Sequence, residues 1–152
     1  MAPFEFLEFT ITPVASFEIE ARVLGRKNYR LGSAADLSPI DLALGSGPMS
    51  DEVVLDRIDI SQSGRFYRWR TDVLPIPRRE IEHNSANMHL IPASASVEDQ
   101  LRQIRKGHIV QLKGHLVNVD RDDGWYWRTS KTRTDTGGGA CELVFVERVT
   151  VY

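Results

Sequence analysis

The sequence predicts a mainly β fold with one packed helix, formed by residues 1–152 as a single domain. Several short segments alternate between apolar and polar residues, which is the pattern of half-buried strands. One segment, 97–104, instead places its apolar residues at helical spacing. A chain of 152 residues with 41% hydrophobic side chains is long enough to bury one core of its own.

The first part of the chain is expected to hold two strands. Residues 4–11 alternate in part before Pro13 interrupts them, and residues 17–24 alternate cleanly between apolar and charged side chains. Such alternation places one face of a strand on a core and the other in water. Gly25 and the polar residues after it are expected to turn the chain.

Residues 32–51 show no regular alternation and are expected to be irregular, with at most one helical turn at 40–44. Asp51 and Glu52 follow Ser50 and precede an apolar run. A capping residue and then an acid in the first turn are typical of a helix start. A short helix is therefore expected at this point.

The middle of the chain is expected to hold an interrupted strand, a second short helix and a loop. Residues 58–70 have the composition of a strand that is broken near Gly64. Pro77 is well placed to open a helix that runs to Glu82. Residues 85–95 are expected to form an ordered loop.

The clearest helix and the clearest strand follow one another. Ser96 begins a capping-box-like segment, and Gly107 is placed to end the helix. Residues 109–119 form a strand in which Gly114 indicates a bulge or a barrel corner.

The Asp-Gly pair at 123–124 indicates a hairpin that returns through 125–127, and residues 142–152 form a last strand. A helix that leads into a glycine-bent strand and then a hairpin favours a small barrel. An OB-like barrel with elaborated loops is the first choice and a β-sandwich the second.

Composition limits the function. A net charge of −2 gives no overall attraction to nucleic acid or to an anionic membrane, so nucleic acid is not the expected partner. The glycine run 137–139 lacks the Lys-Ser/Thr of a nucleotide-binding loop, and no cofactor is expected. The start of the chain has no signal-peptide pattern, and no apolar run is long enough to span a bilayer. The chain as given is therefore expected to be soluble. Its composition does not specify a compartment.

The candidate ligand site lies between two segments, 83–92 and 129–142. The second is long and carries varied polar groups, unlike a plain turn. The expected ligand-binding residues are Asn87, His89, Trp127, Ser130, Arg133 and Asp135. The ligand is expected to be a small polar molecule, a glycan or a protein partner such as a peptide end. The alternative is that Arg133 and Asp135 hold the two segments together.

A catalytic alternative uses Cys141 as the nucleophile of a small hydrolase or transferase. His89 would then act as the base, Asn87 or Asp135 would orient it, and the glycine run before Cys141 would supply backbone N–H donors. A lone cysteine at the start of a strand is more often a small buried residue, so a non-catalytic module is favoured.

Two weaker sites rest on histidines and aromatics. His83 and His89 could form a metal pair, although a spacing of six does not suit one helix face. Residues 65–70 interleave cations with aromatics, with Phe66, Arg68 and Arg70 on one face. That face could bind single-stranded nucleic acid or a glycan, or its arginines could pack on aromatic rings in a half-buried strand.

Several segments of the chain resemble a family of uncharacterised bacterial proteins, a domain of unknown function. The segments are 38–45, 47–51, 60–67, 84–93, Trp127 with 129–130, 132–137 and 140–142. The resemblance covers about residues 20–150 and transfers no activity. It implies that full-length forms are exported or anchored in a membrane through an N-terminal segment.

The same resemblance bears on particular residues. The family pattern includes positions that match His83, His89, Asp135 and Cys141. Where the family has Gly-Trp-Gly, this chain has Gly-Ser-Gly at 45–47. The resemblance therefore implies different ligand contacts at that position.

Overall fold

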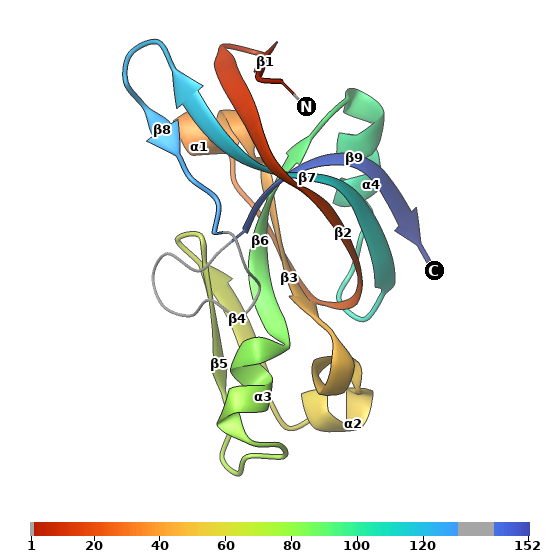
Figure 1. Ribbon diagram of the computed structural model, residues 1–152. Coiled ribbons are helices and arrows are strands. Elements are labelled where there is room, and N and C mark those ends of the chain that lie inside the picture. The colour runs from red at the N-terminus through yellow and green to blue at the C-terminus, as the bar shows by residue number, and fades with distance from the viewer. Residues whose placement is uncertain (1, 131–141) are drawn as a thin grey trace.

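The computed structural model describes residues 2–130 and 142–152 and shows a strongly curled sheet (Figure 1). Five strands pair in a closed circle, in the order β2-β3-β6-β9-β7 and back to β2. All of these pairs are antiparallel except β6 with β9. The strands are β2 (Phe9–Asn28), β3 (Ile40–Gly45), β6 (Ser85–Pro92), β7 (Ile109–Arg121) and β9 (Glu142–Val151). A five-stranded Greek-key barrel of this kind is an OB-like fold, so the predicted fold class is confirmed.

The barrel interior is filled by alternate residues of the five strands. In β3, Ile40, Leu42 and Leu44 belong to this interior cluster and are at most 2% exposed. Helix α4 (Ala95–Arg102) joins β6 to β7 and adds Val97 and Leu101 to the same cluster. The alternation means that the residues between these positions point outwards, where other elements cover them.

β2 is longer than predicted, because neither Pro13 nor Gly25 ends it. The strand pairs with β7 from Phe9 to Arg22, and its register shifts between Pro13 and Ala15. A second shift, between Val23 and Gly25, lies where β2 pairs with β3. Both residues are therefore accommodated as β-bulges, which bend the strand instead of ending it.

Two predictions of non-strand structure are wrong. Residues 40–44, predicted as at most one helical turn, form β3, and all six residues of β3 are buried. Residues 85–92, predicted as loop, form β6, which is buried along nearly its whole length. Strands covered on both faces do not alternate between apolar and polar residues, so their sequences lack the usual signal.

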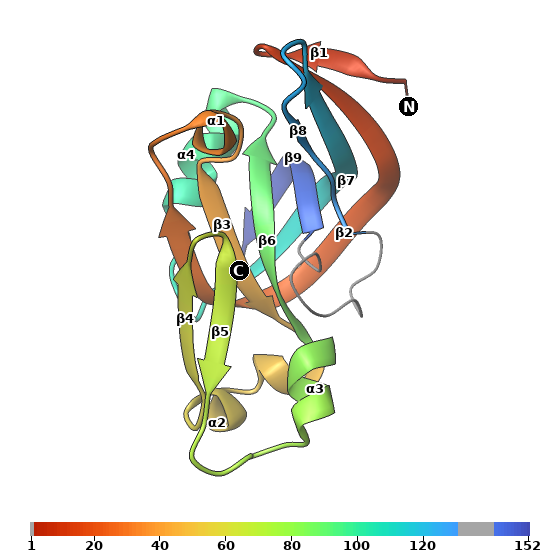
Figure 2. The ribbon, with the colours of Figure 1, turned by 90° about the vertical axis from the view of Figure 1, so that its left-hand side faces the viewer.

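A second, two-stranded sheet is inserted between β3 and β6. It consists of β4 (Asp59–Ser63) and β5 (Phe66–Arg70), which agrees with the predicted break near Gly64. Figure 2 shows this hairpin lying along β3 and β6. The insertion also contains η1 (Gly47–Ser50), α2 (Glu52–Leu55) and α3 (Arg78–His83).

The helices of the insertion begin as the sequence predicts. The side chain of Asp51 accepts a hydrogen bond from the N–H of Val53 (2.9 Å) at the start of α2, and Pro77 immediately precedes α3. An apolar cluster joins the insertion to the barrel. Its buried members are Leu24, Ala43, Met49, Ile58 and Ile81, with Tyr67 and Trp69 packed against them.

The remaining short elements extend the other end of the barrel. β1 (Phe4–Phe6) pairs with β2, α1 (Ser33–Leu37) precedes β3, and β8 (Tyr126–Trp127) pairs with β7. The predicted Asp-Gly hairpin is present, with Gly124 at a φ of 92°. Hydrogen bonds from the Arg121 guanidinium and then from the backbone N–H of Trp125 lower the pKa of the Asp123 carboxyl and fix this turn.

Helix α4 and the strand after it differ from the prediction only in detail. The N-cap is Ser94, whose side chain accepts from the N–H of Val97 (3.2 Å), and the helix ends at Arg102. Gly107, at a φ of 96°, turns the chain into β7 and is not the residue that ends the helix. The bulge predicted at Gly114 is confirmed by a register shift between Lys113 and Gly114.

Candidate functional site

The outer face of β3 and β6 carries polar side chains that are almost completely buried. Because Leu42 and Met88 point into the barrel, Asp41, Asn87 and His89 point out of it. They are nevertheless only 0%, 1% and 4% exposed. An OB barrel binds ligands mainly on the face of its second and third strands, which are β3 and β6 here.

The carboxylate of Asp41 is the hub of this region. Its Oδ1 accepts from Nη1 of Arg65 (2.7 Å) and contacts Nδ1 of His89 (3.0 Å), and its Oδ2 accepts from Nδ2 of Asn87 (3.0 Å). A buried carboxylate needs such partners, since an unpaired one would cost several kcal/mol. We call Ser38, Asp41, Arg65, Asn87 and His89 the Asp41 centre.

The contact with Asp41 sets the tautomer of His89. An ionised carboxylate only accepts hydrogen bonds, so Nδ1 of His89 carries the hydrogen. In the neutral ring Nε2 then holds the lone pair. The same arrangement, a carboxylate that orients an imidazole through one ring nitrogen, occurs both in structural hydrogen-bond networks and in catalytic sites where the histidine is the base.

Arg65 enters the centre from the tip of the β4–β5 hairpin. Its backbone has a φ of 72°, which is uncommon for a residue with a side chain. Its guanidinium donates to the carbonyl of Ser38 (2.7 Å) and lies over the ring of Tyr29, 3.8 Å from the centroid, and near that of Trp127, at 5.2 Å. Gly64, at a φ of 57°, and Arg65 form the two-residue turn between the paired residues Ser63 and Phe66, and a type I′ hairpin turn has positive φ at both of these positions.

Further hydrogen bonds fasten the hairpin to β6. Nε2 of Gln62 donates to Oδ1 of Asn87 (2.9 Å), and the hydroxyls of Tyr67 and Ser85 lie 2.6 Å apart. The carbonyl of Arg65 accepts from Nδ2 of Asn87 (3.0 Å). The hairpin is therefore held by polar contacts along its length as well as by the apolar cluster at its base.

Of the predicted ligand-binding residues, Asn87, His89 and Trp127 lie together. The His89 and Trp127 rings are 4.9 Å apart at 41°. Ser130 is buried at the end of the first described segment. Arg133, Asp135 and Cys141 lie outside the described residues, so the assignment of the site remains a prediction.

The chain on either side of residues 131–141 is anchored beside this centre. The hydroxyl of Thr129 donates to the carbonyl of Ser130 (2.8 Å) and accepts from the N–H of Leu143 (2.9 Å). Leu143 is the strand neighbour of His89. The described ends of the second segment, Thr129–Ser130 and Glu142, therefore lie beside segment 83–92, which is mostly a strand.

Asp41 and Arg65 are central residues that sequence reasoning did not place in the site. Asp41 lies in the run Ile-Asp-Leu-Ala-Leu, which was expected to be at most one turn of helix. The signal that could have identified it is a single acid within a fully apolar run. Such an acid becomes buried when the run is a central strand and must then find partners.

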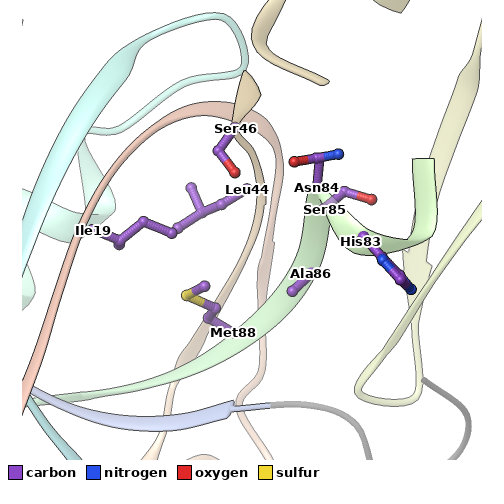
Figure 3. A pocket seen from close by; sticks show the side chains of 8 residues that line it. All are labelled: Ile19, Leu44, Ser46, His83, Asn84, Ser85, Ala86 and Met88. Atoms are coloured by element: carbon purple, nitrogen blue, oxygen red, sulfur yellow. The ribbon is translucent and has the colours of Figure 1, made fainter. Parts of the chain in front are cut away.

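The two histidines of the weak metal alternative lie in different surroundings. His83, in the last turn of α3, lines a hollow of about 10 Å³ at the open end of the barrel, which has room for about one water molecule. Figure 3 shows its imidazole turned away from Ile19 and Met88, whereas His89 is bound to Asp41. In residues 2–130 and 142–152, no group of three or more His, Cys, Asp or Glu side chains is placed to hold a metal ion.

The cation and aromatic strand has the faces that alternation predicts. Phe66, Arg68 and Arg70 are exposed, while Tyr67 and Trp69 face the barrel. Arg70 lies 3.6 Å from Asp59 on the same exposed face. Trp125 and Trp127 are packed against an apolar cluster, with their rings 6.2 Å apart, edge to face.

The fold and the centre together define an OB-like barrel whose usual ligand face is covered by an inserted hairpin. No protein-family model matches this chain, and no curated protein matches it. A solved structure that resembles it is the crystal structure (Form 2) of the mitochondrial single-stranded DNA-binding protein Rim1 from S. cerevisiae. The two are 14% identical, with a TM-score of 0.34, over 90% of this chain and 93% of that one. A resemblance of this degree says nothing about the ligand.

No helix in the described part of this chain is long and apolar enough to span a membrane.

Proposed function

We propose that this protein is a non-catalytic binding or assembly module whose ligand binds between β6 and the 129–142 segment. The observation that carries the proposal is the Asp41 centre, in which both carboxylate oxygens are already used by Arg65, His89 and Asn87. These hydrogen bonds hold the carboxylate, the amide and the ring in fixed positions, so the centre is a rigid support. Rigid polar supports of this kind position the residues of a binding site.

The positions of the family-like segments support this proposal. Those segments contribute Ser38, Asp41, Arg65, Asn87, His89 and Trp127, which meet at one place on the barrel. In the proposed site Trp127 forms a wall, and Ser130, Arg133 and Asp135 provide polar contacts. The ligand is a small polar molecule, a glycan or a peptide end, and the family resemblance suggests that full-length forms present the module at a membrane.

Replacement of Arg133 by alanine tests this proposal. The full chain would be screened by thermal shift against chitotriose, a short peptide with a free C-terminus and a dT12 oligonucleotide. We expect one of the first two to raise Tm in the wild type and in the matched variant Lys131→Ala, but not in Arg133→Ala. Arg133→Ala without ligand should keep the wild-type Tm.

Three results would contradict the proposal or redirect it. If Arg133→Ala lowers Tm by itself, the segment is structural. If no compound acts, the small-ligand form of the proposal fails. If only dT12 binds, and binding weakens strongly with salt, the single-stranded nucleic-acid alternative is favoured, and loss of binding in Arg68→Ala would assign it to the exposed face of β5.

The competing function is a small hydrolase or transferase with Cys141 as nucleophile. One observation favours it: His89 is oriented through Nδ1 by a buried carboxylate, as a catalytic base would be. If this function holds, iodoacetamide alkylates Cys141 of the native chain faster than that of the unfolded chain, and His89→Gln removes the difference. If the protein is instead a binding module, iodoacetamide should alkylate Cys141 in the native chain no faster than in the unfolded chain. Mass spectrometry measures both rates.

A further inference from the structure

A second hollow lies apart from the Asp41 centre and shares no residue with it. It has a volume of about 390 Å³ and lies between β2, α2, the start of β4 and the turn before β7. Cavities that bind small molecules commonly have about 300–1,000 Å³. The hollow is therefore large enough for a small organic ligand.

The floor of this hollow is apolar. Val23, Leu24 and Ile58 are at most 5% exposed, and Leu55 and Ile60 are half-buried beside them. Covering such side chains with an aliphatic group removes apolar surface from water, which is favourable by roughly 25 cal/mol per Å². The floor thus favours a ligand with an aliphatic body.

Arg22 joins the two walls of the hollow and is already neutralised. Its Nε donates to the carbonyl of Ser50 (2.7 Å), and its Nη1 donates to that of Gly107 (2.7 Å). The same Nη1 lies 3.1 Å from Oε1 of Glu52. These contacts fix the width of the hollow before any ligand arrives.

The two remaining charges at the rim are of opposite sign. Lys106 and Asp56 line the hollow and are exposed, and neither side chain forms an ion pair or hydrogen bond within the described residues. A ligand with only a carboxylate would pair with Lys106 but bring its negative charge near Asp56. A ligand with only an amine would pair with Asp56 but bring its positive charge near Lys106. A ligand that carries both groups offers an opposite charge to each.

We propose that this hollow binds a small aliphatic zwitterion, of the chemical class of a free α-amino acid such as leucine. Its side chain lies on the floor formed by Leu55, Ile58 and Ile60. Its carboxylate pairs with Lys106 and its ammonium group with Asp56. This inference does not depend on the proposed function, because the two sites share no residue.

The test is a titration of the full, isotopically labelled chain with L-leucine, 4-methylpentanoate and 3-methylbutylamine, followed by NMR. We expect leucine to shift the amide signals of Val23, Leu24 and Gly107 and to bind roughly two- to fivefold more tightly than either singly charged compound. Lys106→Gln and Asp56→Asn should each weaken leucine binding by a similar factor. Both residues are exposed, so both variants should fold.

Lys113→Gln is the matched control, since Lys113 is an exposed lysine that does not line this hollow. It should bind leucine as the wild type does. The proposal is overturned if leucine leaves these amide signals unchanged up to millimolar concentration. It is also overturned if the three compounds bind equally, which would show an apolar hollow without recognition of the charges.

Discussion

Replacing Asp41 by alanine is expected to lower the free energy of unfolding by about 3–5 kcal/mol. The variant leaves the Arg65 guanidinium, the His89 ring and the Asn87 amide facing a cavity where their shared acceptor was. Asp41 is fully buried and the Arg65 side chain is only 17% exposed, so water replaces little of what is lost. Urea unfolding followed by tryptophan fluorescence measures the change.

The matched control is Asp59→Ala, which removes an acid from the same region of the fold. Asp59 and Arg70 form an ion pair at 3.6 Å whose side chains are 82% and 85% exposed. Exposed pairs contribute little, so the free energy of unfolding should hardly change. If Asp41→Ala costs no more than Asp59→Ala, the centre does not hold the hairpin to the barrel.

Replacing Gly114 by alanine is expected to cost about 3 kcal/mol or more, or to prevent folding. A Cβ atom at this position would lie 1.8 Å from the carbonyl oxygen of Phe145 and 2.9 Å from its carbonyl carbon. The neighbouring atoms belong to the backbone of β9, so the β7–β9 pairing that closes the barrel must move. Urea unfolding together with amide hydrogen exchange in β7 and β9 checks this result.

Gly25→Ala provides the comparison for this prediction. A Cβ at Gly25 would lie 2.6 Å from Oε1 of Gln62, which is the end of a flexible side chain. That side chain can shift at the expense of its hydrogen bond to Asn87. We expect Gly25→Ala to cost less than half as much as Gly114→Ala. Equal costs would mean that the close approach of β7 and β9 is not what requires glycine at 114.

Local signals predicted several strands and turns outside β3 and β6. The strand β7, the hairpin at Gly124 and the last strand β9 were expected at nearly their observed bounds. In each case the signal was an alternation or a turn residue that acts over a few neighbours. The helix α4 was recognised for the same reason, one or two residues from its true start.

The candidate site was predictable only in part. Asn87, His89 and Trp127 were expected to share a site, and they lie together. Asp41 and Arg65 were missed because the sheet brings them together from separate segments. The pairing of β3 with β6 and the fold of the hairpin over both strands depend on contacts that are distant in sequence.

The sequence by itself determined a small, mainly β barrel with one packed helix, because alternation, capping and glycine positions are local properties of the chain. It also determined which residues share a face of β5. Only the tertiary structure decided that β3 and β6 are central strands, and that an inserted hairpin covers the face where OB barrels usually bind ligands. Burial on both sides removes the alternation that marks a strand, and a buried carboxylate such as Asp41 is tolerated only where distant residues converge on it.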